Sequence, residues 1–329
     1  MWLANKSYAI KFAIGIALPL LGLLSFSAAA DNYPNRPIKL VIPYAVGGGS
    51  DAVARIMSPN LKNILNQPIV LENKGGVGST LGTEIVAKSE PDGYTLLLNT
   101  DVIAIMPLLF KKLNFDPQKD FVPISFITSA PIVLAANPEF PANSIKELIA
   151  LAKKSPGQIS LATPGAGSPQ DLASILFAHK AQIKFNSIPY KGNGPALVDI
   201  LAGHVNIGMF TLSTVKEYAK TGKLKILAVI SAKRTPLAPE IISLTEAGLP
   251  DVEVSSKYLI LAPAKTPKDI ISKLEKDFAK LADNKNYQSE LLNLGFEAIS
   301  SSSSETTEIL NKESVKWTPI LKNLDISIQ

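Results

Sequence analysis

The chain has 329 residues, of which 46% are hydrophobic and 19% charged, and its formal net charge is +5 at pH 7. It contains no cysteine, which excludes disulfide bonds, thiolate metal sites and lipid attachment to a cysteine. Basic residues stand singly among acidic ones and form no aromatic and basic stripe, so nucleic-acid binding is not expected.

The first 30 residues have the pattern of a secretory signal peptide. Lys6 and Lys11 precede an apolar run at residues 12–26, and alanines at 28–30 supply the small side chains that a signal peptidase needs. A transmembrane helix is the alternative, but the run is shorter than the roughly 20 apolar residues that span a bilayer. We therefore expect cleavage before Asp31 and export to a bacterial periplasm.

Removal of 30 residues from 329 would leave a soluble mature chain of 299 residues, enough for two domains of typical size. Loss of the two lysines with the leader would lower the net charge from +5 to +3. Such mild basicity suits a protein that captures small anions, although a solvated surface with a slight excess of lysine explains it equally well.

After the leader, short β-branched runs alternate with helical patterns of roughly ten to fifteen residues. This alternation predicts an α/β fold whose largely parallel sheets are covered by helices on both faces. The predicted strands, in chain order, are residues 38–43, 69–73, 95–98, 124–128, 132–136, 159–162, 187–189, 207–210, 226–230 and 258–262.

Several helix boundaries are marked by capping residues. Capping patterns begin at Ser144, Ser168 and Thr266, and the last two place a proline at the first helical position. Pro59 lies inside the helix predicted over residues 51–65, where we expect a lost hydrogen bond and a kink.

A unit of strand, Gly-x-Gly-Ser and helix occurs three times, at residues 47–50, 76–79 and 165–168. Glycine lets the backbone approach a ligand closely, and the first turn of a helix offers unpaired N–H donors at the positive end of its dipole. Each unit is therefore able to hold an anion. Three such units predict a site for an anionic ligand.

Residue types for catalysis or metal binding are scarce. His179 and His204 are the two histidines, and without cysteine they cannot build a usual zinc site or a cysteine–histidine pair. His179 lies in a predicted helix and His204 in a turn, so we interpret both as structural. The sequence has no Gly-x-Ser-x-Gly elbow, no phosphate loop and no His-Glu-x-x-His motif. We expect no catalytic residue, no metal and no cofactor.

One enzyme interpretation stays open at this point. Gly47, Gly49 and Ala52 follow a strand and open a helix, and Glu72 ends the next strand, which matches a loose dinucleotide-binding fingerprint. The predicted export opposes this interpretation, because nicotinamide cofactors are cytoplasmic. A Rossmann-type nicotinamide-dependent enzyme is therefore the alternative to a binding protein.

Seven motifs stand in family-like order and spacing between Tyr33 and the final helix. They are Pro34-Asn35-Arg36-Pro37-Ile38, Val46-Gly47-Gly48-Gly49-Ser50-Asp51 with Arg55, Glu72-Asn73-Lys74-Gly75-Gly76 with Gly78, Pro91-Asp92-Gly93-Tyr94-Thr95-Leu96-Leu97, Lys119-Asp120-Phe121, Pro189-Tyr190-Lys191-Gly192 and Thr245-Glu246-Ala247-Gly248-Leu249-Pro250. On these motifs the chain resembles the Bug, or TctC-type, family, the extracytoplasmic solute receptors of tripartite tricarboxylate transporters.

The resemblance implies a type II periplasmic-binding-protein fold, in which two lobes are joined by two crossover strands and a ligand lies in the cleft between them. The first lobe would comprise residues 31–125 and about 228–329, and the second lobe about 126–227. In that family, backbone N–H groups and ordered waters of two loops grip a ligand carboxylate. Here those loops would be residues 46–51 and 163–168.

The resemblance and the glycine-rich units together suggest ten ligand-binding residues. Polar contacts are expected from Ser50, Asp51, Thr163 and Ser168, and close backbone approach from Gly48, Gly49, Ala166 and Gly167. Asn99 and Thr100 are further candidates, because they end a first-lobe strand at the carboxyl edge of the sheet. The loop at residues 76–79 either flanks the cleft or merely forms a tight turn.

Three positions depart from the family pattern. Asp171 stands where the family commonly has histidine, Thr211 where it commonly has aspartate, and Lys257 near a position that is usually tryptophan. Asp171 either adds negative charge near an anion loop or completes the helix cap that begins at Ser168, which is the interpretation we prefer. Lys257 either faces a second carboxylate of the ligand or lies on a solvated surface, and we prefer the surface. The part of the ligand that lies away from the bound carboxylate is therefore not predictable from the family.

The sequence thus predicts a monomeric periplasmic receptor without catalytic activity, which captures a small carboxylate and delivers it to the membrane subunits of a tripartite tricarboxylate-type transporter. A sensory module that presents its closed form to a receptor kinase is a further alternative.

Overall fold

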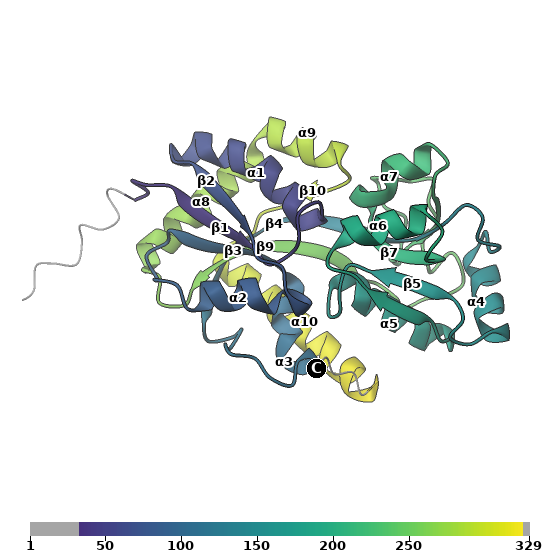
Figure 1. Cartoon of the computed structure of the whole chain (residues 1–329). Coiled ribbons are helices and arrows are strands. Elements are labelled where there is room, and N and C mark those ends of the chain that lie inside the picture. The colour runs from purple at the N-terminus through teal and green to yellow at the C-terminus, as the bar shows by residue number, and fades with distance from the viewer. Residues whose placement is uncertain (1–32, 325–329) are drawn as a thin grey trace, which may run out of the picture.

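The computed structural model describes residues 33–324, so the predicted signal peptide lies outside the described residues. Two α/β lobes lie side by side, each with a sheet between helices (Figure 1). A two-lobed arrangement of this kind is what the resemblance to the Bug family implies. Within the described part of the chain, no helix combines the length and the apolar character needed to cross a bilayer.

The first lobe is built on a mixed sheet. Its strand order is β2, β1, β3, β9 and β4, with β10 paired to β4; β1, β2 and β3 are parallel, and β9 is antiparallel to both of its neighbours. The strands are β1 (Ile38–Ile42), β2 (Ile69–Asn73), β3 (Thr95–Thr100), β4 (Phe121–Ala136), β9 (Ser255–Pro263) and β10 (Glu297–Ala298).

Helices cover both faces of this sheet because side chains alternate along its strands. Leu40 packs in one apolar core with helices α1, α8 and α9, whereas Val41 packs in another with α2, α3 and α10. The helices are α1 (Gly49–Leu65), α2 (Thr80–Ala87), α3 (Met106–Leu109), α8 (Lys268–Asp283), α9 (Lys285–Asn293) and α10 (Ser303–Leu324), with 3-10 turns η1 (Val77–Ser79) and η2 (Asp101–Ile105).

The second lobe has its own sheet, ordered β8, β4, β7, β5 and β6. Strand β5 is parallel to β6 and β7, and β4 is antiparallel to β7 and β8. Helices α4 and α5 pack in one apolar core, and α6 and α7 in another. The elements are α4 (Ile145–Lys154), β5 (Ser160–Thr163), α5 (Pro169–Ala181), β6 (Asn186–Pro189), α6 (Asn193–Leu201), β7 (Ile207–Thr211), α7 (Leu212–Lys220) and β8 (Lys225–Val229).

Strand β4 connects the two lobes. The separate strands predicted at residues 124–128 and 132–136 are one strand of 16 residues, because the chain between them keeps its pairing with β9 as far as Pro131. From Ile132 onward, β4 pairs with β7 and β8 of the second lobe. The other predicted strands are found within three residues at either end, and β10 was not predicted. The lobe boundaries near residues 126 and 227 stay a prediction.

Two of the three predicted helix caps are found. Ser144 and Ser168 are the N-caps of α4 and α5, and each hydroxyl accepts a hydrogen bond from the N–H three residues later. The cap predicted at Thr266 is wrong: α8 begins one residue later, with Pro267 at the N-cap, and the buried Thr266 hydroxyl has no hydrogen-bond partner in the described chain. Helix α1 continues through Pro59.

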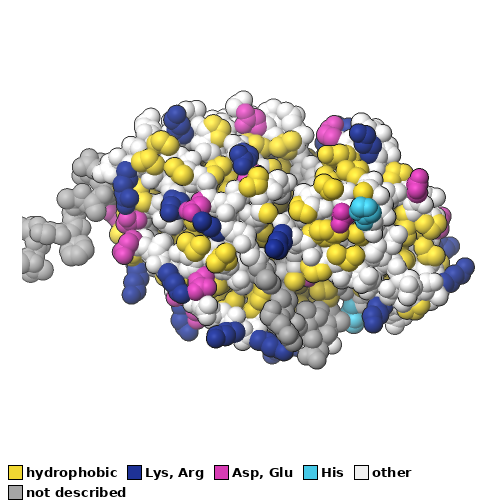
Figure 2. All heavy atoms as spheres, viewed as in Figure 1, with side chains coloured by type: hydrophobic (Ala, Val, Ile, Leu, Met, Phe, Trp, Pro, Cys, Tyr) yellow, Lys and Arg dark blue, Asp and Glu magenta, His cyan; other side chains and the backbone are white. Residues whose placement is uncertain are grey.

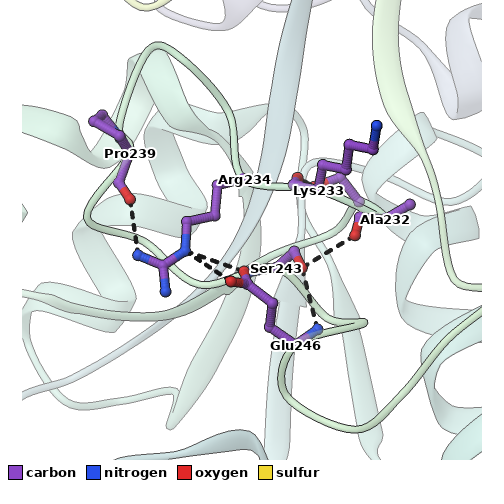
Figure 3. Close-up of polar contacts among 7 residues, drawn as sticks. Ala232, Lys233, Arg234, Pro239, Ser243 and Glu246 are labelled. Atoms are coloured by element: carbon purple, nitrogen blue, oxygen red, sulfur yellow. Dashed lines mark hydrogen bonds and ion pairs between the residues drawn. The ribbon is translucent and has the colours of Figure 1, made fainter.

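The long connection from β8 to β9 is held by one cluster of polar contacts (Figure 3). The Arg234 side chain donates to both Glu246 carboxylate oxygens, at 3.0 and 3.1 Å, and to the Pro239 carbonyl oxygen. Glu246 also accepts from the Ser243 N–H, and the Ser243 hydroxyl accepts from the Glu246 N–H, as in a capping box. The motif at residues 245–250 therefore includes an acid that orders this loop.

On the face seen in Figure 2, lysine and arginine side chains are spread among acidic ones rather than gathered into one basic stripe.

Candidate functional site

Three helices begin around one small cavity between the lobes. The cavity has a volume of about 30 Å³, enough for one or two water-sized groups. Helix α1 of the first lobe contributes Gly48 to Ser50, and helices α5 and α6 of the second lobe contribute Ser168 to Gln170 and Gly192 to Asn193. Because each N-terminus carries partial positive charge, their convergence favours a negatively charged group at this point.

Backbone donors in these turns are unpaired within the described chain. The N–H groups of Gly48, Gly49 and Ser50 have no protein acceptor there, and the same holds for Gln170 and Asn193. They are the donors that the first turn of a helix leaves without an intrahelical partner. The site therefore offers N–H groups from both lobes.

Close approach explains the glycine at position 49. A Cβ atom built on Gly49 would lie 2.4 Å from the Tyr258 hydroxyl oxygen and 3.5 Å from the Thr211 Oγ1 atom. Tyr258 belongs to the first lobe and Thr211 to the second, so α1 begins at the point where the lobes meet. Position 211, where the family pattern differs, thus lies beside the predicted anion loop.

In the first loop, Asp51 points into the protein and does not line the small cavity. Its Oδ2 atom accepts from the Gly47 N–H at 3.0 Å and from the Arg55 Nε at 2.9 Å. Burial opposes its ionisation, but these hydrogen bonds outweigh burial and lower the pKa of Asp51. The carboxylate therefore shapes the loop and uses one of its donors.

The second loop repeats this arrangement. Asp171 Oδ2 accepts from the Gly167 N–H at 2.9 Å, and its Oδ1 lies 3.4 Å from the Thr163 hydroxyl. The backbone N–H of Asp171 bonds the Ser168 hydroxyl at 3.2 Å, which confirms that Asp171 belongs to the helix cap. Burial raises the pKa of Asp171, although both bonds to its carboxylate oppose the shift.

Buried polar side chains complete the wall of the small cavity. Tyr44 Oη lies 3.3 Å from Thr100 Oγ1, and burial raises the pKa of the Tyr44 and Tyr258 phenols, so both stay protonated. Asn193 Oδ1 and Ser256 Oγ are buried, and neither has a hydrogen-bond partner in the described structure. Two unsatisfied polar atoms beside unpaired N–H groups indicate that this cavity receives a polar ligand group or water.

A larger cavity of about 670 Å³ adjoins the small one. Tyr44, Ala45, Pro164, Ser168 and Gly192 line both, so the two form one continuous space between the lobes. The volume lies in the range of small-molecule sites.

The third glycine-rich unit flanks this larger cavity. Gly76, Gly78 and Ser79 line it, and a Cβ atom on Gly78 would lie 3.0 Å from the Ala166 carbonyl oxygen of the second lobe. Ser79 has a left-handed backbone conformation and no side-chain cap bond. The unit therefore touches the opposite lobe across the cleft and does not repeat the capped helix start of Ser168.

The structure brings most predicted site residues together. Five of them line the small cavity: Gly48, Gly49, Ser50, Thr100 and Ser168. Ala166 lines the larger one. The remaining four lie behind the walls and line neither cavity: Asp51, Thr163, Gly167 and Asn99, whose side chain bonds Thr83 and the Thr100 N–H.

The prediction that Lys257 lies on a solvated surface is wrong. Helix α10 covers it, and its ammonium group forms an ion pair with Glu313 and lies 3.7 Å from Asp101. Burial raises the pKa of Asp101 to about 7, against the attraction of the Lys257 charge. These residues line a separate cavity of about 100 Å³, so Lys257 does not reach the cleft cavities.

The residues that match the dinucleotide-binding fingerprint do not all reach the cleft, because Gly49 lines the small cavity but Glu72 does not. Glu72 forms ion pairs with Lys39 and Lys74 and lines neither cleft cavity. His179 is exposed on α5, and the His204 ring lies 3.3 Å from Asp199. Among residues 33–324, no three histidine or acidic side chains are grouped so that they could hold a metal ion.

Comparison with known proteins points to a single family. A family model described as the tripartite tricarboxylate transporter family receptor, TctC, matches residues 53–326. The protein BugT of Bordetella pertussis is 32% identical over 311 residues, which cover 94% of this chain and 95% of BugT.

Solved structures of periplasmic binding proteins superpose closely on this chain. BugD is 32% identical, with a TM-score of 0.85, and the match covers 90% of this chain and 100% of BugD. Rpa4515 of R. palustris, solved with adipate, is 28% identical with a TM-score of 0.86, covering 90% of this chain and 100% of that one. MatC of Rhodopseudomonas palustris, solved with bound malate, is 28% identical with a TM-score of 0.82. The match covers 88% of this chain and 100% of MatC.

Proposed function

The chain belongs to the TctC family of tripartite tricarboxylate transporter receptors, and from this premise we propose that it captures a small carboxylate in the cleft between its lobes. The bound ligand is then delivered to the membrane subunits of a tripartite transporter. The protein acts in the periplasm, as a monomer and without catalysis.

One observation carries this proposal: the N-termini of α1, α5 and α6 meet at one cavity with unpaired N–H groups from both lobes. Relatives solved with adipate and malate support a carboxylate as the ligand class. Neither cleft cavity is lined by arginine among the described residues, so backbone N–H groups are the main anion donors available.

Backbone N–H donors are strong enough to bind a carboxylate with micromolar affinity. A partly buried anion at a helix N-terminus gains up to about 2 kcal/mol, and each hydrogen bond to a charged acceptor contributes roughly 1.5–3 kcal/mol. Two or three such bonds with water bridges approach the roughly 8 kcal/mol of a micromolar complex, provided that closure excludes bulk water.

Closure of the lobes follows from the same arrangement. The lobes touch across the cleft, where a Cβ atom on Gly192 would lie 3.4 Å from the Ala45 Cβ. Only a closed form brings N–H groups of both lobes to one anion, so the ligand shifts the population toward that form. A membrane partner is then able to distinguish loaded from empty receptor.

A thermal-shift screen of the ligand-stripped mature chain, residues 31–329, tests the proposal. A carboxylate at 100 times its dissociation constant should stabilise the protein by about 2.7 kcal/mol, and the matching neutral amide should not. Stabilisation by a neutral sugar, with no response to any acid, would overturn the anion site. Stabilisation by a nicotinamide dinucleotide would instead favour the enzyme alternative.

A further inference from the structure

The cleft carries very little charge where the body of a ligand would lie. Among the described residues that line the two cavities, Lys191 alone is charged, and its side chain is exposed. The two nearby acids, Asp51 and Asp171, lie behind the loops and bond the N–H groups of Gly47 and Gly167. A ligand in the cleft therefore meets no carboxylate, and it meets one cation at the rim.

Three polar side chains in the wall of the larger cavity, those of Tyr44, Asn73 and Tyr190, are already bonded within the protein. The Tyr190 hydroxyl donates to Asp199 at 2.5 Å, and Asn73 Nδ2 donates to the Tyr44 carbonyl at 3.1 Å. The Tyr44 hydroxyl lies 3.3 Å from the Thr100 hydroxyl. Tyr44 and Tyr190 therefore offer a ligand mainly ring surface.

Apolar surface stands on both sides of the same cavity. Pro43 and Ala45 contribute it from the first lobe, and Pro164, Ala166 and Pro189 from the second. Rigid apolar walls on two sides suit a flat ring or an alkyl chain. A second ionised group in that position would lose hydration without gaining a buried partner.

We propose that the ligand is a monocarboxylate with an uncharged, mainly apolar body, either a ring or a chain. Its carboxylate lies at the small cavity among the three helix N-termini, and its body fills the larger one. Dicarboxylates, tricarboxylates and amino acids bind more weakly, because Lys191 is the one charged side chain that a second carboxylate meets among the described lining residues, and an ammonium group meets no acid there. This inference rests on the proposed function and narrows its substrate class.

Calorimetric titration of the mature chain with four six-carbon compounds distinguishes the monocarboxylate inference from the proposed carboxylate-binding function. The compounds are hexanoate, adipate, 6-aminohexanoate and hexanamide. Benzoate and benzamide repeat the comparison with a ring. We expect hexanoate or benzoate to bind at least tenfold more tightly than adipate and 6-aminohexanoate, and the amides not to bind. If adipate or 6-aminohexanoate binds as tightly as both monocarboxylates, this inference is wrong and the proposed function stands. If no acid binds better than its amide, the proposed function itself fails.

A substitution at the rim provides a second test. Lys191→Met removes the one cation among the described residues that line the cavities, so the ratio of hexanoate to adipate affinity should widen at least threefold. Lys223→Met is the matched control, because Lys223 is exposed and lines neither cavity, and it should leave the ratio unchanged. A ratio that is unchanged or narrowed in Lys191→Met would contradict the charge argument.

Discussion

Two serines make the same helix cap, but only one of them faces the cleft. Ser168 Oγ accepts from the Asp171 N–H at 3.2 Å and lines both cavities. Ser144 Oγ accepts from the Glu147 N–H at 3.2 Å and lines neither. Replacing each by alanine therefore removes an equivalent cap, while only Ser168→Ala removes a hydroxyl that can donate to a bound carboxylate.

The two effects differ in size and can be separated. Loss of an N-cap lowers the free energy of unfolding by about 1 kcal/mol, and this applies to both variants. Loss of a hydrogen bond to a charged acceptor removes about 1.5–3 kcal/mol of binding energy, which raises the dissociation constant roughly 10- to 150-fold. Only Ser168→Ala should show this second effect.

Denaturant unfolding and calorimetric titration of both variants, with the strongest carboxylate from the screen, measure the two quantities. Comparable losses of stability with a selective loss of affinity in Ser168→Ala are expected. Equal weakening of ligand binding in both variants, or wild-type affinity in Ser168→Ala, would refute the reasoning.

Three further predictions concern the loops around the anion site. Gly49→Ala should destabilise the protein by about 1–3 kcal/mol, because the new Cβ atom would lie 2.4 Å from the Tyr258 hydroxyl oxygen. The double variant Gly49→Ala, Tyr258→Phe lacks that oxygen and should recover part of the lost stability in calorimetric unfolding. Asp171→Asn removes a negative charge behind the second loop while its amide oxygen can still accept from Gly167, so carboxylate affinity at pH 7 should rise about 2- to 5-fold; a titration showing weaker binding would contradict this. Because the pKa of Asp51 is lower in the folded state, the ionised carboxylate stabilises the protein fully above its unfolded pKa near 4, and this stabilisation is lost as the pH falls through the folded pKa. The difference in unfolding free energy between wild type and Asp51→Asn should therefore shrink below about pH 4. A difference that grows on acidification would contradict this.

Local signals in the sequence were enough to predict an α/β fold and three glycine-rich units, whereas the two-lobed fold and the choice of the loops at residues 46–51 and 163–168 came from the family resemblance. Ser50 and Ser168 stand at helix starts that follow buried strands, one in each lobe, at the carboxyl edge of an α/β sheet where ligand-binding loops occur. The arrangement of Asp51 and Asp171 was also readable in principle. In both loops, an acid four residues after a glycine accepts that glycine's N–H, as the spacing allows.

Contacts between distant segments could not be predicted from these signals. Tyr258 and Ser256 reach the site from the strand that pairs with β4, and no local pattern indicates which of their neighbours face the cleft. The start of α6 at Asn193 lacks a serine or threonine cap, so its contribution was missed. Lys257 was misjudged because the helix that covers it carries Glu313, 56 positions later in the chain.

A crystal structure of the mature chain with its strongest carboxylate is the most direct test of the central claim. It should show the carboxylate oxygens about 2.7–3.1 Å from N–H groups at the start of α1 on one side and of α5 or α6 on the other, directly or through one ordered water. A ligand whose carboxylate instead pairs with Lys191 at the rim, leaving those N–H groups to bulk water, would contradict it.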